Sequence, residues 1–207
     1  MPSQESIILV ILAGFALSAS PGPSMLYVLS RSLGQDRNAG LASAAGLATG
    51  GVVHAVAAAL GLSALLTYSP ELYRGVTILG AAYLVYLGVQ MYRSRNDEVG
   101  ETEAVVRQPL RKIFTQGVVV EVLNPKTALF FVAFLPQFVN QEVSPVMLQV
   151  LVLGMLIPLT AIPSDLIVAY TGGTLARRIS GNARARSVLN CLGAAFLVGL
   201  GLQIVLI

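Results

Sequence analysis

Two proline-containing polar stretches interrupt apolar segments of this 207-residue chain, and they hold most of the residues that could bind a solute. They comprise Ser20, Pro21, Gly22, Pro23 and Ser24 in the first stretch, and Asn124, Pro125 and Lys126 in the second. Proline has no N–H and disrupts the helical hydrogen bond to the carbonyl four residues back. The carbonyls of Leu17 and Glu121 are thereby freed as acceptors. The helices that restart after Pro23 and Pro125 offer N–H groups and a positive dipole end.

Each break thus places acceptors for a cation next to donors for an anion. A zwitterion such as an amino acid matches that arrangement. The competing interpretation is a structural proline kink at each position. Two breaks flanked by polar residues favour a binding site, with the eight residues of the two stretches as substrate contacts.

Three further residues in apolar segments could carry a coupling proton: His54, Glu121 and Asp165. Ionisable groups at membrane depth are costly, at least ~2.5 kcal/mol for charged types, and usually mark a transport pathway. Histidine titrates near physiological pH. The competing roles are packing for His54 and a solvated entrance position for Glu121. Lys126 could bind a substrate carboxylate or pair with either acidic residue.

The composition identifies the class of protein. The chain is 55% hydrophobic and 11% charged, whereas soluble domains carry about 25% charged residues. The net charge of +3 does not indicate nucleic-acid binding, because the basic residues lie between apolar runs. The single cysteine, Cys191, excludes an internal disulfide or a cysteine-cluster metal site. We expect an all-α integral membrane protein that has no metal and no cofactor.

Six apolar runs are long enough to cross a bilayer. They cover residues 4–31, 41–67, 72–92, 115–138, 146–175 and 187–206. Eleven of the 13 basic residues lie in the connections after the first, third and fifth runs, if Arg31 at the end of the first run is counted with the connection that follows it. The positive-inside rule therefore makes these connections cytoplasmic and places both termini outside. No basic n-region precedes the first run, which we expect to be retained rather than cleaved as a signal peptide.

The third and sixth runs repeat one another. Residues 79–90 and 192–203 are identical at nine of twelve positions. Each half holds three spans, so the second half must be inverted relative to the first. We expect one transmembrane domain over 1–207, built from inverted repeats over about 1–93 and 115–207 with a linker over about 94–114. Its first and fourth helices would be broken by prolines, as in secondary transporters with a midplane site.

At these residues the chain resembles the LysE-type amino-acid exporters, also called the RhtB or homoserine/threonine-efflux family. The resemblance covers nearly the whole chain, and the residues that carry it are Ser20-Pro21-Gly22-Pro23, Gly46 to Gly61 with His54, Gln116-Gly117, Leu123 to Phe131, Phe134 to Phe138, and Gly193 to Gln203. It implies a multi-pass exporter of amino acids in a bacterial inner membrane, driven by the proton motive force. The chain departs from the family pattern at Ser24, where Asn is usual, and at Glu121, where a neutral amide is usual.

The predicted function is export of amino acids or similar small zwitterions from the cytoplasm by proton antiport, in contact with the lipid bilayer. The alternative is a half-helix channel for small polar solutes. An intramembrane enzyme is disfavoured, because no nucleophile-elbow or zinc-protease motif is present. A pairing of Ser24 or Ser164 with His54 is the remaining enzymatic arrangement. The sequence leaves open a homo-oligomer and the identity of the substrate.

Overall fold

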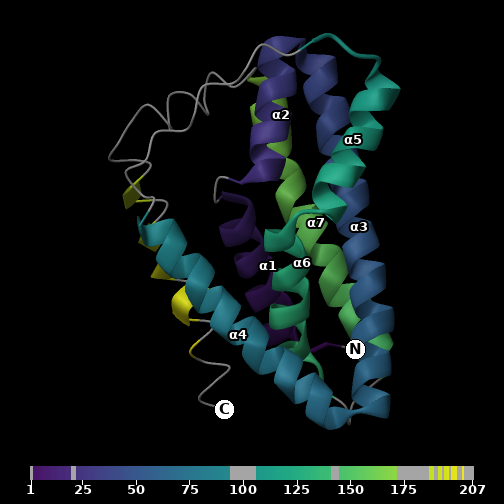
Figure 1. Ribbon diagram of the computed structural model, residues 1–207, viewed down its shortest axis with the longest axis vertical. Coiled ribbons are helices and arrows are strands. Elements are labelled where there is room, and N and C mark those ends of the chain that lie inside the picture. The colour runs from purple at the N-terminus through teal and green to yellow at the C-terminus, as the bar shows by residue number, and fades with distance from the viewer. Residues whose placement is uncertain are drawn as a thin grey trace.

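The computed structural model describes residues 2–19, 22–93, 106–140 and 145–171, together with 187–188, 191–192, 194–195, 197–199 and 202. The regular structure in these residues is helical, which confirms the predicted all-α class (Figure 1). The elements are α1 (Gln4–Ala19), α2 (Pro23–Gly34), α3 (Arg37–Tyr68), α4 (Pro70–Arg93), α5 (Leu110–Val122), α6 (Pro125–Phe134), the 3₁₀ helix η2 (Leu135–Phe138) and α7 (Val146–Tyr170).

Two of these helices are long and apolar enough to cross a membrane, Arg37–Leu65 of α3 and Val146–Tyr170 of α7. The number rises to four if each of two bent helix pairs forms one span. The runs predicted over 41–67, 72–92 and 146–175 correspond to α3, α4 and α7. Most of the run over 187–206, and with it most of the repeated segment, lies outside the described residues.

The bent pairs coincide with the two polar stretches. Helices α1 and α2 meet at 54°, and α5 meets the α6–η2 segment at 48°. Pro23 and Pro125 each occupy the first turn of the second helix of a pair, where the missing N–H costs no hydrogen bond. In Figure 1, α2 and α5 occupy the upper half of the molecule and α1 and α6 the lower half, so both bends lie at mid-height.

Helix α3 contacts both bent pairs, through α2 and α5, and it also packs closely on α7. Small residues allow these approaches. A Cβ on Gly51 would lie 2.7 Å from Pro158 Cβ, and one on Gly117 would lie 2.9 Å from the Ser43 carbonyl oxygen. Helix α1 in turn packs on α7, where Gly14 faces Thr160. Gly40, Gly46, Gly50 and Gly51 of α3 are therefore packing residues, whereas a Cβ on Gly61 would meet open space.

Helix α5 begins at Leu110, earlier than the predicted run at 115 and inside the predicted linker over 94–114. The physical reason is a set of hydrogen bonds from α2 to the chain just before it. Arg31 Nη1 donates to the Val106 carbonyl at 3.3 Å. The side-chain amide of Gln35 donates to the Gln108 carbonyl and accepts from the Gln108 N–H, both at 2.9 Å. These bonds order the chain up to Pro109, so the helix can start directly after it.

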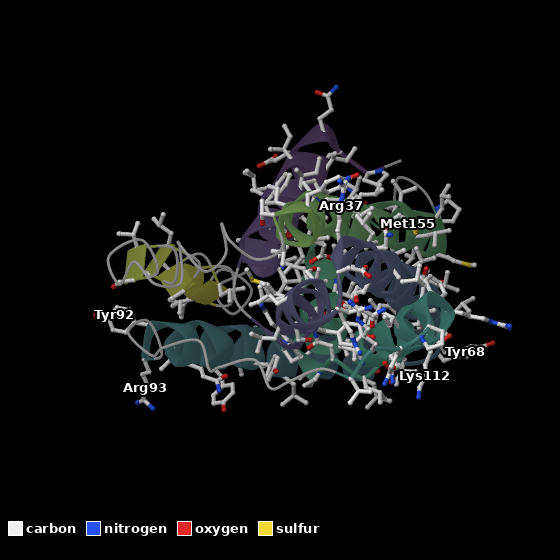
Figure 2. The ribbon with its side chains drawn as sticks, turned by 90° about the horizontal axis from the view of Figure 1, so that it is seen from above. Arg37, Tyr68, Tyr92, Arg93, Lys112 and Met155 are labelled. Atoms are coloured by element: carbon white, nitrogen blue, oxygen red, sulfur yellow. The ribbon has the colours of Figure 1, made fainter. Side chains whose placement is uncertain are left out.

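Helix α4 crosses the molecule diagonally and packs on α6 (Figure 1). Viewed from above, its end at Tyr92 and Arg93 lies apart from the packed helices (Figure 2). Gly88 faces Val198, at 2.7 Å from a Cβ placed on the glycine. Large apolar side chains such as Leu72 and Leu79 are exposed along α4, 62% and 72% respectively. Such a surface suits lipid rather than water.

Candidate functional site

A cavity of about 70 Å³ lies where the two bends meet α3 and α7. One water molecule needs roughly 10–15 Å³, so the space can hold several waters or small polar groups. Its polar lining residues are Ser18, Ser24, Glu121, Asn124, Lys126, Thr127 and Asp165. Gly22 also lines it. Most of the predicted substrate and proton residues are therefore brought together in one space, whereas Ser20 and Pro21 lie outside the described residues.

Lys126 joins the two breaks. Its Nζ donates a 2.9 Å hydrogen bond to the carbonyl oxygen of Leu17, at the end of α1. Pro21 has no N–H to offer that carbonyl, so the ammonium group of the second break supplies a donor to the first. A charged donor on a carbonyl makes a stronger bond than a neutral one. The sequence predicted that the freed Leu17 carbonyl could accept a cation. In the structure, the cation at this carbonyl is the side chain of Lys126.

His54 forms a hydrogen bond with the Glu121 carbonyl of the second break. Its Nε2 lies 2.8 Å from the Glu121 carbonyl oxygen, which also accepts the Asn124 N–H at 3.0 Å. A carbonyl only accepts, so Nε2 carries a proton. The ring stacks on Phe131 with centroids 5.6 Å apart. His54 contacts the main chain of the break, and it is not among the residues that line the cavity.

Ser24, Glu121 and Asn124 form a hydrogen-bonded chain across the two breaks. Asn124 Oδ1 accepts the Lys126 N–H at 3.0 Å, and this bond fixes the orientation of the amide. Asn124 Nδ2 then donates to Ser24 Oγ at 2.9 Å. The Ser24 hydroxyl donates in turn to Glu121 Oε2. The direction of donation runs from the amide through the hydroxyl to the carboxyl group.

Asp165 contributes a second carboxyl group from α7. It follows Pro158 and Pro163, two prolines that lie inside this continuous helix. Only 9% of the residue is exposed, and it lines the cavity. No hydrogen bond or ion pair from the described residues reaches its carboxyl group. Its side chain therefore faces the cavity without a protein partner in that part of the chain.

The two helix starts at the site differ in their caps. Asn124 caps α6 by accepting the Lys126 N–H. Gly22 precedes α2 in an extended conformation and has no side chain to cap it. The first N–H groups of a helix need partners from outside the helix. The start of α2, with Ser24 and Met25 in the cavity wall, is thus the more available donor end.

A polar contact between α2 and α5 was not predicted from the sequence. Tyr27 Oη donates to the Ile113 carbonyl at 2.8 Å, and Arg31 Nη2 donates to Gln116 Oε1 at 3.0 Å. The sequence placed Arg31 in a basic connection as a topology signal. The structure places it inside α2 with 8% exposure, because amide and carbonyl partners on the neighbouring segment receive its donors. The signal that could have located this contact is the pair of glutamines at 108 and 116 that follow the acidic segment.

The two serines suggested as enzymatic partners of His54 have other contacts. Ser164 Oγ donates to the Ala161 carbonyl at 2.8 Å, and Ser24 Oγ donates to Glu121. The imidazole Nε2 is bound to a main-chain carbonyl. Among the described residues these contacts assemble no serine–histidine pair.

Sequence comparisons with known proteins find relatives that are membrane and efflux proteins. An uncharacterized membrane protein of Pseudomonas aeruginosa is 35% identical over 193 residues, which is 89% of this chain and 87% of the relative. A homoserine/homoserine lactone efflux protein of Salmonella typhimurium is 32% identical over 186 residues, 90% of this chain and 87% of the relative. A leucine efflux protein of Salmonella choleraesuis is 35% identical over 122 residues, 58% of this chain and 57% of the relative. No solved structure matches the chain.

The sequence family model of the LysE type translocators matches residues 15–206. This range contains the α1–α2 bend, the α5–α6 bend and every charged residue that lines the cavity. The match confirms the resemblance read from the sequence: the chain belongs to the LysE type translocator family.

Proposed function

We propose that the protein is a secondary active transporter that exports amino acids or similar small zwitterions from the cytoplasm by proton antiport. The observation that carries this proposal is the cavity at the two bends, which combines a helix start, an ammonium group and two carboxyl groups within a membrane protein. The names of two relatives, a homoserine/homoserine lactone efflux protein and a leucine efflux protein, support amino-acid export.

The scaffold would be six spans arranged as two inverted repeats, with the first and fourth spans broken. Two contacts support it: α1 packs on α7 as α5 packs on α3. Discontinuous helices at corresponding positions of two repeats are typical of secondary transporters that work by alternating access. Rocking of one repeat against the other would expose the cavity to each side in turn.

The orientation would place the basic end of the bundle in the cytoplasm of a bacterial cell, with the protein in the inner membrane and both termini outside. Arg31, Arg37 and Arg111 support this, since they lie at the end of α2 and at the starts of α3 and α5. Arg37 also contacts the Tyr170 ring at the end of α7, 3.7 Å from its centroid. Basic residues collect on the cytoplasmic side.

The substrate carboxylate would bind the first turn of α2, which has no side-chain cap, with Lys126 nearby. Glu121 and Asp165 would receive its ammonium group. Of the three predicted proton carriers, Asp165 is the one we assign, because its carboxyl group faces the cavity without a partner in the described chain. Glu121 would assist it, and His54 would hold the Glu121 carbonyl.

The test is transport by the purified protein in liposomes with an imposed pH gradient. Candidate substrates come from a metabolite survey of medium from overexpressing cells. We expect saturable uptake of the substrate against its own concentration gradient. This uptake should stop when the pH gradient is dissipated. Flux that rises linearly with concentration and ignores the pH gradient would instead support the half-helix channel. Export of no amino compound at all would overturn the proposal.

A further inference from the structure

We propose that Ser24, Asn124 and Glu121 form a charge-selecting element, and that it makes the cavity prefer amino compounds of net charge +1 over neutral zwitterions. This inference rests on the proposed function, because it names the substrate class of the same cavity. Three features carry it: the occupation of the freed carbonyls, the charge balance of the lining and the direction of the hydrogen bonds.

Two of the carbonyl groups freed by the prolines are already occupied. Leu17 O accepts from Lys126 Nζ at 2.9 Å, and Glu121 O accepts from His54 at 2.8 Å. We therefore expect the ammonium group of a substrate to bind elsewhere in the cavity. The remaining acceptors with charge are the carboxyl groups of Glu121 and Asp165.

The charged lining has two acidic residues and one basic residue, Lys126. Glu121 and Asp165 are each only 9% exposed. An isolated buried charge is costly, so a buried carboxyl group is either protonated or paired. Asp165 has no hydrogen-bond or ion-pair partner among the described residues, although it faces the cavity. After Asp165 has released its proton, the lining carries one excess negative charge, which a ligand of net charge +1 would balance and a neutral zwitterion would not.

The hydrogen-bonded chain keeps Glu121 an acceptor. If the side-chain amide of Asn124 were flipped, Oδ1 could no longer accept the hydrogen bond from the Lys126 N–H. The oxygen of the Ser24 hydroxyl accepts a hydrogen bond from that amide, and the hydroxyl proton is donated to Glu121. A hydroxyl that donates to a carboxylate forms a charge-assisted bond. The two departures from the family pattern, Ser24 and Glu121, are thus bonded to each other, and a serine hydroxyl suits a carboxylate neighbour.

The test compares ornithine with norleucine, whose side chains differ by an ammonium group in place of a methyl group. Counterflow of each is measured in liposomes that contain the full-length protein. We expect the wild type to prefer ornithine by about 10- to 100-fold, since a hydrogen bond to a charged group contributes that much. Glu121→Gln and the double variant Ser24→Asn/Glu121→Gln should reduce this preference by about tenfold or more, with norleucine flux falling less than ornithine flux.

Glu71→Gln is the matched control, because Glu71 is exposed in the first turn of α4 and lies away from the cavity. It should leave the preference unchanged. A wild-type preference near one, a preference for norleucine, or an unchanged preference in monodisperse Glu121→Gln protein overturns the inference while leaving amino-acid export intact. Flux of neither compound, together with flux of no other amino compound, overturns the proposed function as well.

Discussion

The two bends of this protein are built alike but differ in how their polar groups are satisfied. At the α5–α6 bend, Asn124 caps the restarting helix, and His54 binds the freed carbonyl. At the α1–α2 bend, Gly22 provides no side-chain cap, and the carbonyl of Leu17 receives Lys126 from the other bend. The second bend caps its own helix start, and its Lys126 donates to the first bend. The first is the half with main-chain donors left for a ligand.

The largest effect should follow from removing the link between the bends. We expect Lys126→Met to reduce counterflow by about 100-fold, because a hydrogen bond from a charged group is lost and two carboxyl groups remain without a basic residue in the described cavity lining. The measurement is initial counterflow rate in liposomes. Lys112→Met, at an exposed position of α5 (Figure 2), is the control and should behave as wild type. Wild-type rates in Lys126→Met would show that the bends work independently.

Asp165→Asn should abolish proton-driven export while leaving the protein folded. The amide cannot release a proton to the outside, so accumulation driven by a pH gradient should disappear, whereas counterflow should persist in part. Both are measured in the same proteoliposomes, and size-exclusion chromatography in detergent reports folding. Full accumulation driven by the pH gradient in this variant would contradict the assignment of Asp165.

The two helix caps allow a direct comparison of the bends by stability. Asn124→Ala should destabilise the protein by about 0.5–2 kcal/mol, because the Lys126 N–H loses its cap. Gly22→Ala should cost less than that, since the extended conformation at Gly22 suits any residue, but it should weaken substrate binding at α2. Thermal unfolding in detergent and the KM for transport separate the two effects. Equal losses of stability would mean that the bends are capped equivalently.

The smallest effect should come from His54. We expect His54→Phe to lower stability by about 1 kcal/mol, since it loses one hydrogen bond to the Glu121 carbonyl and keeps the ring packing on Phe131. Proton-coupled transport should remain within a few-fold of wild type. Loss of the dependence on the pH gradient in this variant would move the proton carrier from Asp165 to His54.

Much of the architecture follows from local chemistry that can be read along the chain. Proline is favoured in the first turn of a helix and asparagine is a strong cap, so the start of α6 at Pro125 was predictable. The start of α5 was not, because it depends on Gln35 and Arg31 from a helix more than 70 positions earlier. The burial of Arg31 was not predicted either, because the sequence placed this residue in a basic connection and its partners lie far along the chain.

The amino-acid sequence by itself determined that the chain belongs in a bilayer and that helices start at Pro23 and Pro125 beside polar residues, because hydropathy and the preference of proline for a first helical turn are local properties. Only the tertiary structure decided how those groups pair. Lys126 binds the carbonyl of Leu17, and Ser24 binds the carboxyl group of Glu121, across separations of 109 and 97 positions. Such pairings depend on how α3 brings the two bends together through its small residues, and no local pattern specifies that.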